Sequence, residues 1–190
     1  MKKNKVKQAL KEGKTVIGTM ITEFRTPEIA RMIAAAGFDF ILIDTEHSPF
    51  TLETVVDIVR ACRAVDMVCL VRVPDAEYHL IARTLDAGAD GLMIPRVETR
   101  EVVKQIVQAV KYPPWGVRGY GLRAIITNYE KVGVGDWTEW LNENTMIVIQ
   151  IERKRAIENI DQLISVRGVD VALIGPNDLS ISLGVPGQLD

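Results

Sequence analysis

The stretch GFDFILID, residues 37–44, decides the fold because it recurs twice along the chain. The related stretches are GADGLMIP at 88–95 and GVDVALIG at 168–175. Each begins with a glycine after a helix-like segment, where glycine supplies the left-handed residue that ends a helix. Each then passes through an aspartate into an apolar run, which is typical of a parallel strand covered on both faces. The repeat therefore predicts helix–turn–strand units.

Three further apolar runs raise the number of predicted strands to six: VIGTM at 16–20, MVCLVRV at 67–73 and MIVIQIE at 146–152. Helix-like segments separate most of them, at the spacing of one βα unit. In the longest interval, KYPPWGVRGYGLRA at 111–124 is predicted to be a functional loop followed by more helix. A (β/α)8 TIM barrel is the first choice and an open doubly wound sheet the second, with residues 1–190 forming a single domain.

Composition narrows the class of protein. The 190 residues are 47% hydrophobic, which suits one globular core. A net charge of −2 gives no case for binding nucleic acid or an anionic membrane, and no apolar run reaches the ~20 residues of a membrane span. The basic segment at 1–14 is predicted to be a helix that turns Val6 and Leu10 inward. Cys62 and Cys69 are predicted to be buried free thiols of a cytoplasmic protein.

Polar side chains gather where the predicted strands end, which is where barrels of this kind carry catalytic groups. They are Asp44, Glu46, His47, Arg72, the segment PRVET at 95–99, Gln150, Glu152 and Asp178. Glu152 shares a strand face with Gln150, because side chains alternate along a strand. Two unpaired carboxylates there would be costly to bury. Glu152 and Asp178 therefore either hold a hard divalent cation such as Mg²⁺ or pair with Arg153 and Arg155.

The other polar residues leave similar alternatives. A buried Arg72 needs an anionic partner, which is either Asp44 or Glu46 or a substrate oxygen. His47 is either a structural hydrogen-bonding residue or a base oriented by its acidic neighbours. The lysines all lie outside the apolar strands, which disfavours Schiff-base catalysis.

Six stretches in the right order together resemble the HpcH/HpaI aldolase family. They are GFDFILIDTEHSPF (37–50), LVRVP (70–74), LDAGADGLMIPRVET (85–99), YPPWGVRGYG (112–121), VIQIE (148–152) and GVDVALIGPNDLSISLG (168–184). The resemblance implies a (β/α)8 barrel and a class II aldolase that cleaves a 4-hydroxy-2-oxo acid to pyruvate and an aldehyde. It also implies a cation, Mg²⁺ or Mn²⁺ or possibly Co²⁺, small-molecule partners only, and a homo-oligomer, a trimer or a hexamer.

The resemblance further implies roles for individual residues. By motif these are Glu152 and Asp178 as metal ligands, His47 as the catalytic histidine, Asp44 as the acid that orients it, Arg72 as the contact to the pyruvate oxygen, Gln150 as a polar neighbour of metal and substrate, and Gly175, Pro176 and Asn177 as the segment that binds the pyruvate carboxylate.

Some features depart from the family pattern. Arg153 stands where the family commonly has a small residue, and it would narrow the mouth of the site or bind a distal acidic group. The role of Glu46 stays open between a hydrogen bond and a salt bridge. Only about six βα units precede Asp190, so we expect a C-terminally truncated barrel. Two alternative functions are a citrate-lyase-β-like lyase acting on acyl-CoA and an inactive subunit that has a structural or ligand-binding role.

Overall fold

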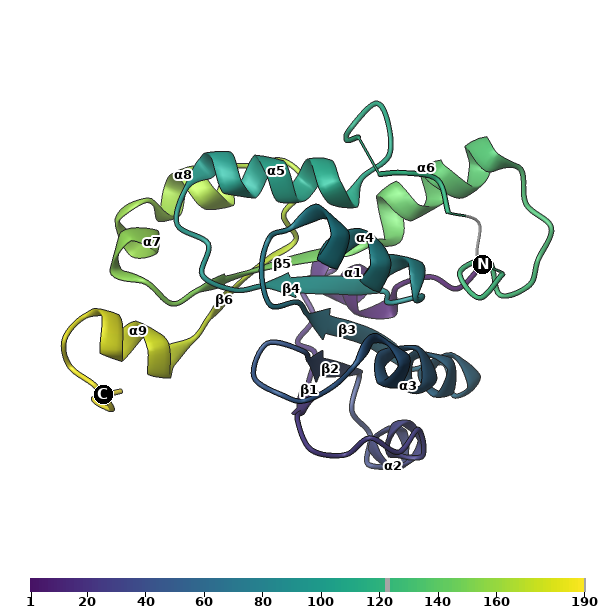
Figure 1. The fold of residues 1–190 in the computed structure, drawn as a ribbon, viewed down its shortest axis with the longest axis horizontal. Helices are drawn as coiled ribbons and strands as arrows, with labels where there is room; N and C mark the ends of the chain where they lie inside the picture. Colours follow the sequence, from purple (N-terminus) through teal and green to yellow (C-terminus); the bar gives the residue numbers. More distant parts are fainter. Residues whose placement is uncertain (122–123, 190) are drawn as a thin grey trace.

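A computed structural model describes residues 1–121 and 124–189, in which one parallel sheet has its strands in chain order. The strands are β1 (Gly18–Ile21), β2 (Phe40–Asp44), β3 (Val68–Arg72), β4 (Gly91–Ile94), β5 (Met146–Ile151) and β6 (Val171–Ile174). All six predicted strands are confirmed. The sheet curls into part of a barrel (Figure 1). Consecutive strand order contradicts the doubly wound alternative, in which the order reverses at a switch point. Six strands do not make a closed eight-stranded barrel.

Helices connect the strands, and most of them cover the outer face of the sheet, whereas the amino-terminal helix packs against the inner face (Figure 1). They are α1 (Lys5–Lys11), α2 (Ile29–Ala35), α3 (Leu52–Ala64), α4 (Tyr78–Asp86), α5 (Arg100–Val110), α6 (Val134–Asn144), α7 (Lys154–Glu158), α8 (Ile160–Ile164) and α9 (Pro176–Ser182). The helix-like segment before Gly168, AIENIDQLISVR at 156–167, forms two short helices rather than one, because Asn159 ends α7 and begins α8. Of the predicted 111–124 loop, Leu122 and Arg123 lie outside the described residues. Within the described ranges, no helix has the length and apolar character needed to cross a membrane.

Alternation along the strands gives the sheet two different faces. On the outer face, Ile41 and Ile43 of β2 pack under the helices. On the inner face, Leu42 and Leu70 pack together with Val6 of α1, as predicted for that helix. Cys62 and Cys69 lie in the outer layer as buried free thiols, which confirms their predicted state.

The repeated aspartates fix where each strand begins. The carboxylates of Asp39, Asp90 and Asp170 accept hydrogen bonds from the backbone N–H groups of Ile17 at 2.7 Å, Cys69 at 2.9 Å and Ile147 at 2.9 Å. In each case the donor belongs to the neighbouring strand or the residue that leads into it. The preceding glycines, Gly37, Gly88 and Gly168, have φ values of 84°, 102° and 110°, which only glycine adopts readily. The motif found in the sequence thus sets the strand register.

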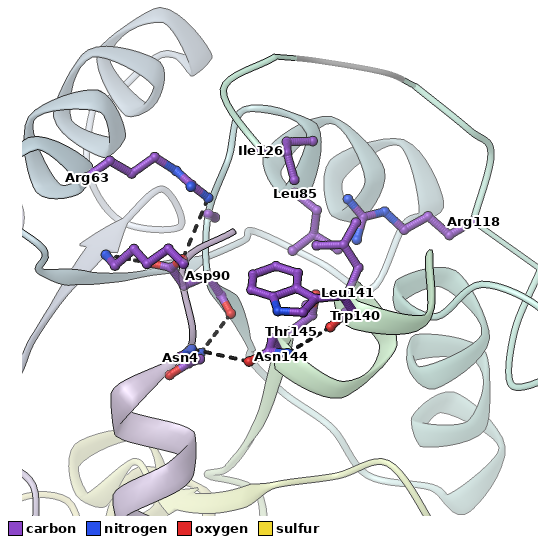
Figure 2. A pocket seen from close by; sticks show the side chains of 12 residues that line it. Asn4, Arg63, Leu85, Asp90, Arg118, Ile126, Trp140, Leu141, Asn144 and Thr145 are labelled. Atoms are coloured by element: carbon purple, nitrogen blue, oxygen red, sulfur yellow. Dashed lines mark hydrogen bonds and ion pairs between the residues drawn. The ribbon is translucent and has the colours of Figure 1, made fainter. Parts of the chain in front are cut away.

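Asp90 helps to close the sheet at the amino ends of its strands. Its carboxylate lies 3.7 Å from Arg63, and its carbonyl accepts a hydrogen bond from Asn4 at 3.0 Å (Figure 2). The cavity drawn in Figure 2 has a volume of about 10 Å³, which is room for about one water molecule. It lies at the amino ends of the strands, opposite to the predicted catalytic residues, and it is too small for a substrate.

Two lysines share one carbonyl oxygen at the same end of the sheet. Lys7 and Lys111 each donate to the Thr145 carbonyl at 3.0 Å, and Lys7 is also paired with Asp170 at 3.0 Å. Lys111 is buried and has only carbonyl oxygens as its hydrogen-bond partners in the described residues. Burial, together with the charge of Lys7, lowers the pKa of Lys111 to about 7.

This lysine makes stability depend on pH. Because its folded pKa lies below the ordinary value near 10.4, the unfolded chain binds more protons between about pH 7 and pH 10. The free energy of unfolding should therefore rise with pH in this window, by up to about 1.4 kcal/mol per pH unit from this group. Replacing Lys111 with Met should remove this rise, as measured by urea unfolding. Lys104→Met, on the exposed side of α5, is the matched control and should leave the rise intact.

Candidate active site at the carboxyl ends of the strands

Four of the predicted functional side chains meet on the inner face because they continue the inward alternation of their strands. Asp44 and Arg72 are direct register partners on β2 and β3. Gln150 belongs to β5 and Glu152 follows its last residue. All four side chains are at least 90% buried. The structure therefore brings together polar groups from three strands in one water-poor site.

Asp44 and Arg72 form a two-pronged ion pair. Arg72 Nε donates to Asp44 Oδ1 at 2.8 Å and Arg72 Nη2 to Asp44 Oδ2 at 2.7 Å. Burial acts to raise the pKa of Asp44, but the hydrogen bonds and charge of Arg72, with those of two backbone N–H groups, hold it below its usual range. Burial likewise acts to lower the pKa of Arg72, and its acidic neighbours hold it above the ordinary value. Both groups are therefore charged at neutral pH.

Glu46 joins this pair from the loop after β2. Its carboxylate lies 3.3 Å from Arg72 Nη1 and 3.5 Å from Arg96 Nε, and its side chain is 7% exposed. Its Oε2 atom is buried and has no hydrogen-bond partner among the described residues. Of the two roles left open for Glu46, the geometry favours the salt bridge.

His47 differs from its expected arrangement. Asp44 contacts the backbone N–H of His47 at 3.4 Å, while both of its carboxylate oxygens bind Arg72. The carboxylate nearest to the imidazole is that of Glu46, 3.7 Å from Nε2. The expected Asp44–His47 side-chain pair is therefore not formed, because the cross-strand arginine competes for the same carboxylate. The His47 side chain is 65% exposed.

Glu152 is held by two short hydrogen bonds. Its Oε1 accepts from the backbone N–H of Arg96 at 2.7 Å and its Oε2 from Gln150 Nε2 at 2.6 Å. Burial raises the pKa of Glu152, and the charges of Glu46 and Asp178 raise it further against the lowering effect of the Arg96 N–H. Gln150 Oε1 is buried without a donor among the described residues. The site thus concentrates negative charge and unsatisfied oxygen atoms.

Gly175 lets the end of β6 approach these groups. A Cβ atom at this position would lie 2.6 Å from Gln150 Nε2 and 2.8 Å from Glu152 Oε2, so no other residue fits without displacing them. The chain then enters α9, whose first turn carries the exposed Asp178. Pro176 lacks an N–H, so the free donors of this turn are the N–H groups of Asn177 and Asp178.

The alternative ion pairs are not formed. Arg153 and Arg155 are exposed, and in the described ranges neither lies within 4.0 Å of Glu152 or Asp178. Nor do these ranges contain three acidic, histidine or cysteine side chains grouped to hold a metal ion. A cation here would need two carboxylates plus oxygen atoms from water or substrate, the usual coordination of Mg²⁺.

Sequence reasoning overlooked Arg96. It follows β4 and contacts both Glu46 and Glu152. In the sequence it was noted only as part of the segment PRVET at 95–99, with no role of its own. The available signal was its position, because it stands at the end of a strand like the other site residues.

Comparison with known proteins identifies similar chains. The family model described as HpcH/HpaI aldolase/citrate lyase matches residues 20–190. A hydroxypyruvate/pyruvate aldolase from Deinococcus radiodurans is 38% identical over 181 residues, which are 95% of this chain and 65% of that protein. A 2-keto-3-deoxy-L-rhamnonate aldolase from Salmonella gallinarum is 37% identical over 184 residues, which are 96% of this chain and 68% of that protein.

A solved structure agrees with the sequence comparison. The crystal structure of an HpcH/HpaI aldolase from Desulfitobacterium hafniense superimposes with a TM-score of 0.93 at 38% identity, covering 97% of this chain and 71% of that one. The chain thus spans about two thirds of the length of the curated relatives that it matches. These matches confirm the predicted family, and the names of the relatives agree with the predicted class of carbon–carbon lyases.

Proposed function

Because the chain belongs to the HpcH/HpaI aldolase/citrate lyase family, we propose that the protein is a divalent-cation-dependent aldolase that cleaves a 4-hydroxy-2-oxo acid to pyruvate and an aldehyde. One observation carries the proposal: the buried Glu152 carboxylate lies in the field of Glu46 and Asp178, beside a Gln150 oxygen that has no donor among the described residues. Relatives named as pyruvate and 2-keto-3-deoxy-L-rhamnonate aldolases support the same reaction class.

The residues at the site fit a hard divalent cation. Glu152 and Asp178 would hold it, and its charge would relieve the crowding that raises the pKa of Glu152. Oxygen donors of this kind suit Mg²⁺ or Mn²⁺, and Co²⁺ is also compatible. When bound, the cation would supply Lewis-acid polarisation of the 2-oxo group. Gln150 Oε1 has no hydrogen-bond donor among the described residues. In the proposed complex it would accept a hydrogen bond from a water or a substrate hydroxyl.

The protein's own residues have separate tasks in this proposal. Asp44 fixes the Arg72 guanidinium by two hydrogen bonds, so Arg72 enters the reaction already oriented. Arg72 would then donate to the oxygen that becomes negative when the carbon–carbon bond breaks and pyruvate leaves as its enolate. The free N–H groups after Gly175, in the segment with Pro176 and Asn177, would bind the pyruvate carboxylate.

Proton transfer would fall to His47. The C4 hydroxyl must lose its proton as the aldehyde forms, and the exposed imidazole can accept it directly or through a water. Because Asp44 is engaged with Arg72, we assign the orientation of the imidazole to Glu46, 3.7 Å away, with Asp44 holding the backbone N–H of His47. Arg153, which is exposed beside Glu152, would either narrow the mouth of the site or bind a distal acidic group of the substrate.

We further propose that residues 1–190 are one domain whose six strands belong to a (β/α)8 barrel, and that the protein forms a homo-oligomer. The high structural similarity to a longer HpcH/HpaI aldolase supports the barrel. Its partners would be a small 2-oxo acid and an aldehyde. The subunit number expected from the family is three or six.

Pyruvate release tests the proposal. A panel of 4-hydroxy-2-oxo acids should yield pyruvate, as measured with lactate dehydrogenase and NADH. EDTA should abolish the release and excess Mg²⁺ or Mn²⁺ should restore it. Turnover that persists in EDTA would contradict the cation mechanism. Turnover confined to acyl-CoA substrates would favour the citrate-lyase-like alternative, and cation binding without any turnover would favour an inactive subunit.

A further inference from the structure

Arg96 adopts a conformation that its residue type disfavours. Its φ is 54°, in the left-handed region that few residues other than glycine enter. Such conformations persist only where the surrounding structure holds them, and they concentrate at functional sites. Here the unusual backbone lies directly after β4, among the site residues. The left-handed conformation of Arg96 is therefore expected to serve the site.

The left-handed turn aims the Arg96 N–H into the site. That N–H donates to Glu152 Oε1 at 2.7 Å, which is one of the two hydrogen bonds that fix this carboxylate. The chain that follows is anchored, because the Glu98 carbonyl accepts a hydrogen bond from Asn159 at 3.0 Å. An ordinary negative φ at Arg96 would therefore have to be taken up by rotating the preceding peptide plane, which carries this N–H, away from Glu152. The hydrogen bond to Glu152 therefore depends on the disfavoured conformation.

The side chain of Arg96 holds the turn in place. Its guanidinium donates to the carbonyl of Pro74 and lies 3.5 Å from Glu46 and 3.6 Å from Asp75. Pro74 and Asp75 belong to the loop after β3, so the side chain ties the end of β4 to the neighbouring strand end. These contacts explain why arginine rather than glycine occupies a left-handed position.

We propose that Arg96 is a positioning residue: its side-chain contacts to the loop after β3 hold a left-handed turn that presents its backbone N–H to Glu152 and so keeps this carboxylate ready for a divalent cation. The inference rests on the proposed function for the cation. It assigns Arg96 no contact with the substrate.

Two variants separate the effect of the backbone conformation of Arg96 from the effect of its positive charge. Arg96→Gly and Arg96→Val both remove the guanidinium, so any electrostatic change at the site is the same in both. Glycine adopts the left-handed turn freely and keeps the N–H on Glu152. Valine is β-branched and resists a positive φ, so the N–H should leave the carboxylate.

The readout is the dissociation constant for Mn²⁺, measured from the electron paramagnetic resonance signal of the free ion. R96G should bind Mn²⁺ within about threefold of the unmodified protein. R96V should bind about 10- to 100-fold more weakly, the loss typical when a group that orients a metal ligand is removed. Far-ultraviolet circular dichroism checks folding, and R96A, which also carries a Cβ, provides the comparison should R96V not fold.

Equal Mn²⁺ affinities of R96G and the Cβ-bearing variant would overturn the positioning role while leaving the proposed function intact. Failure of the unmodified protein to bind Mn²⁺ would overturn both. A stronger affinity in both variants would show that Arg96 acts only through its positive charge, which also contradicts the inference.

Discussion

Replacing Glu152 with glutamine is expected to lower pyruvate formation by roughly 10³-fold and to abolish Mn²⁺ binding. The cation's Lewis-acid effect is worth several kcal/mol, and each 1.36 kcal/mol corresponds to a factor of ten in rate. Folding should survive the change. The glutamine oxygen can still accept from the Arg96 N–H, and Gln150 can turn its amide so that its unpartnered Oε1 faces the new NH₂ group.

The E152Q variant is also expected to change the thermal stability of the cation-free protein in a definite direction. The pKa of Glu152 is raised in the folded protein, chiefly by burial, so stability is lost as the pH rises from the ordinary glutamate value through the raised pKa, and the loss persists at higher pH. E152Q should therefore have a Tm at pH 7–8 equal to or above that of the parent in the absence of cation. Glu158→Gln makes the same chemical change at an exposed site on α7 and should alter neither activity nor Mn²⁺ affinity. Full activity of E152Q would exclude Glu152 as a ligand.

Arg72→Met should impair both stability and activity. Removing one partner of a buried ion pair typically costs 3–5 kcal/mol, about the range expected here, because Asp44 is left buried and unpaired. Losing a donor to the developing enolate oxygen should lower kcat by about 10²- to 10³-fold. The Asp44 pKa is lowered in the folded protein, so the pair stabilises above pH ~4 and this contribution is lost as the pH falls further. The stability gap between parent and R72M should close in acid.

A double variant distinguishes the two effects. Asp44→Asn combined with R72M leaves no unpaired Asp44 charge, so it should regain part of the stability measured by urea unfolding without regaining activity. Arg60→Met, which breaks an exposed contact to Asp57 at 3.8 Å, should cost at most about 1 kcal/mol and no activity. An R72M protein as stable as the parent would contradict the buried pair.

Much of the fold could be predicted because its signals are local. The glycines at 37, 88 and 168 predict helices that end in a residue of left-handed conformation, and all three have positive φ. The apolar runs predict the strands, and alternation places Gln150 beside Glu152, where a hydrogen bond of 2.6 Å joins them. The break at Asn159 was missed because the apolar spacing continues across it, although asparagine commonly caps helices.

The site was predicted in part. The positions of the strand ends determine which side chains come together, and these positions could be read from the sequence. The register between strands determines which of those side chains pair, and this could not be read from the sequence. Asp44 was expected to orient His47, its neighbour in sequence. The β2–β3 register instead places Arg72 directly opposite, and a buried guanidinium outcompetes an exposed imidazole for the carboxylate. Arg96 was noted only as part of the strand-end segment PRVET, and its role was missed because nothing in the sequence marks an arginine that adopts a left-handed conformation.

The central claim is that a divalent cation held by Glu152 and Asp178 at the strand ends stabilises the enolate of pyruvate. The most direct test is exchange of the pyruvate methyl protons in D₂O, followed by proton NMR, because it needs no knowledge of the aldehyde. We predict exchange that requires both the protein and Mg²⁺, stops in EDTA and is lost in E152Q. Exchange that is independent of the cation, or none with the cation present, would contradict the account.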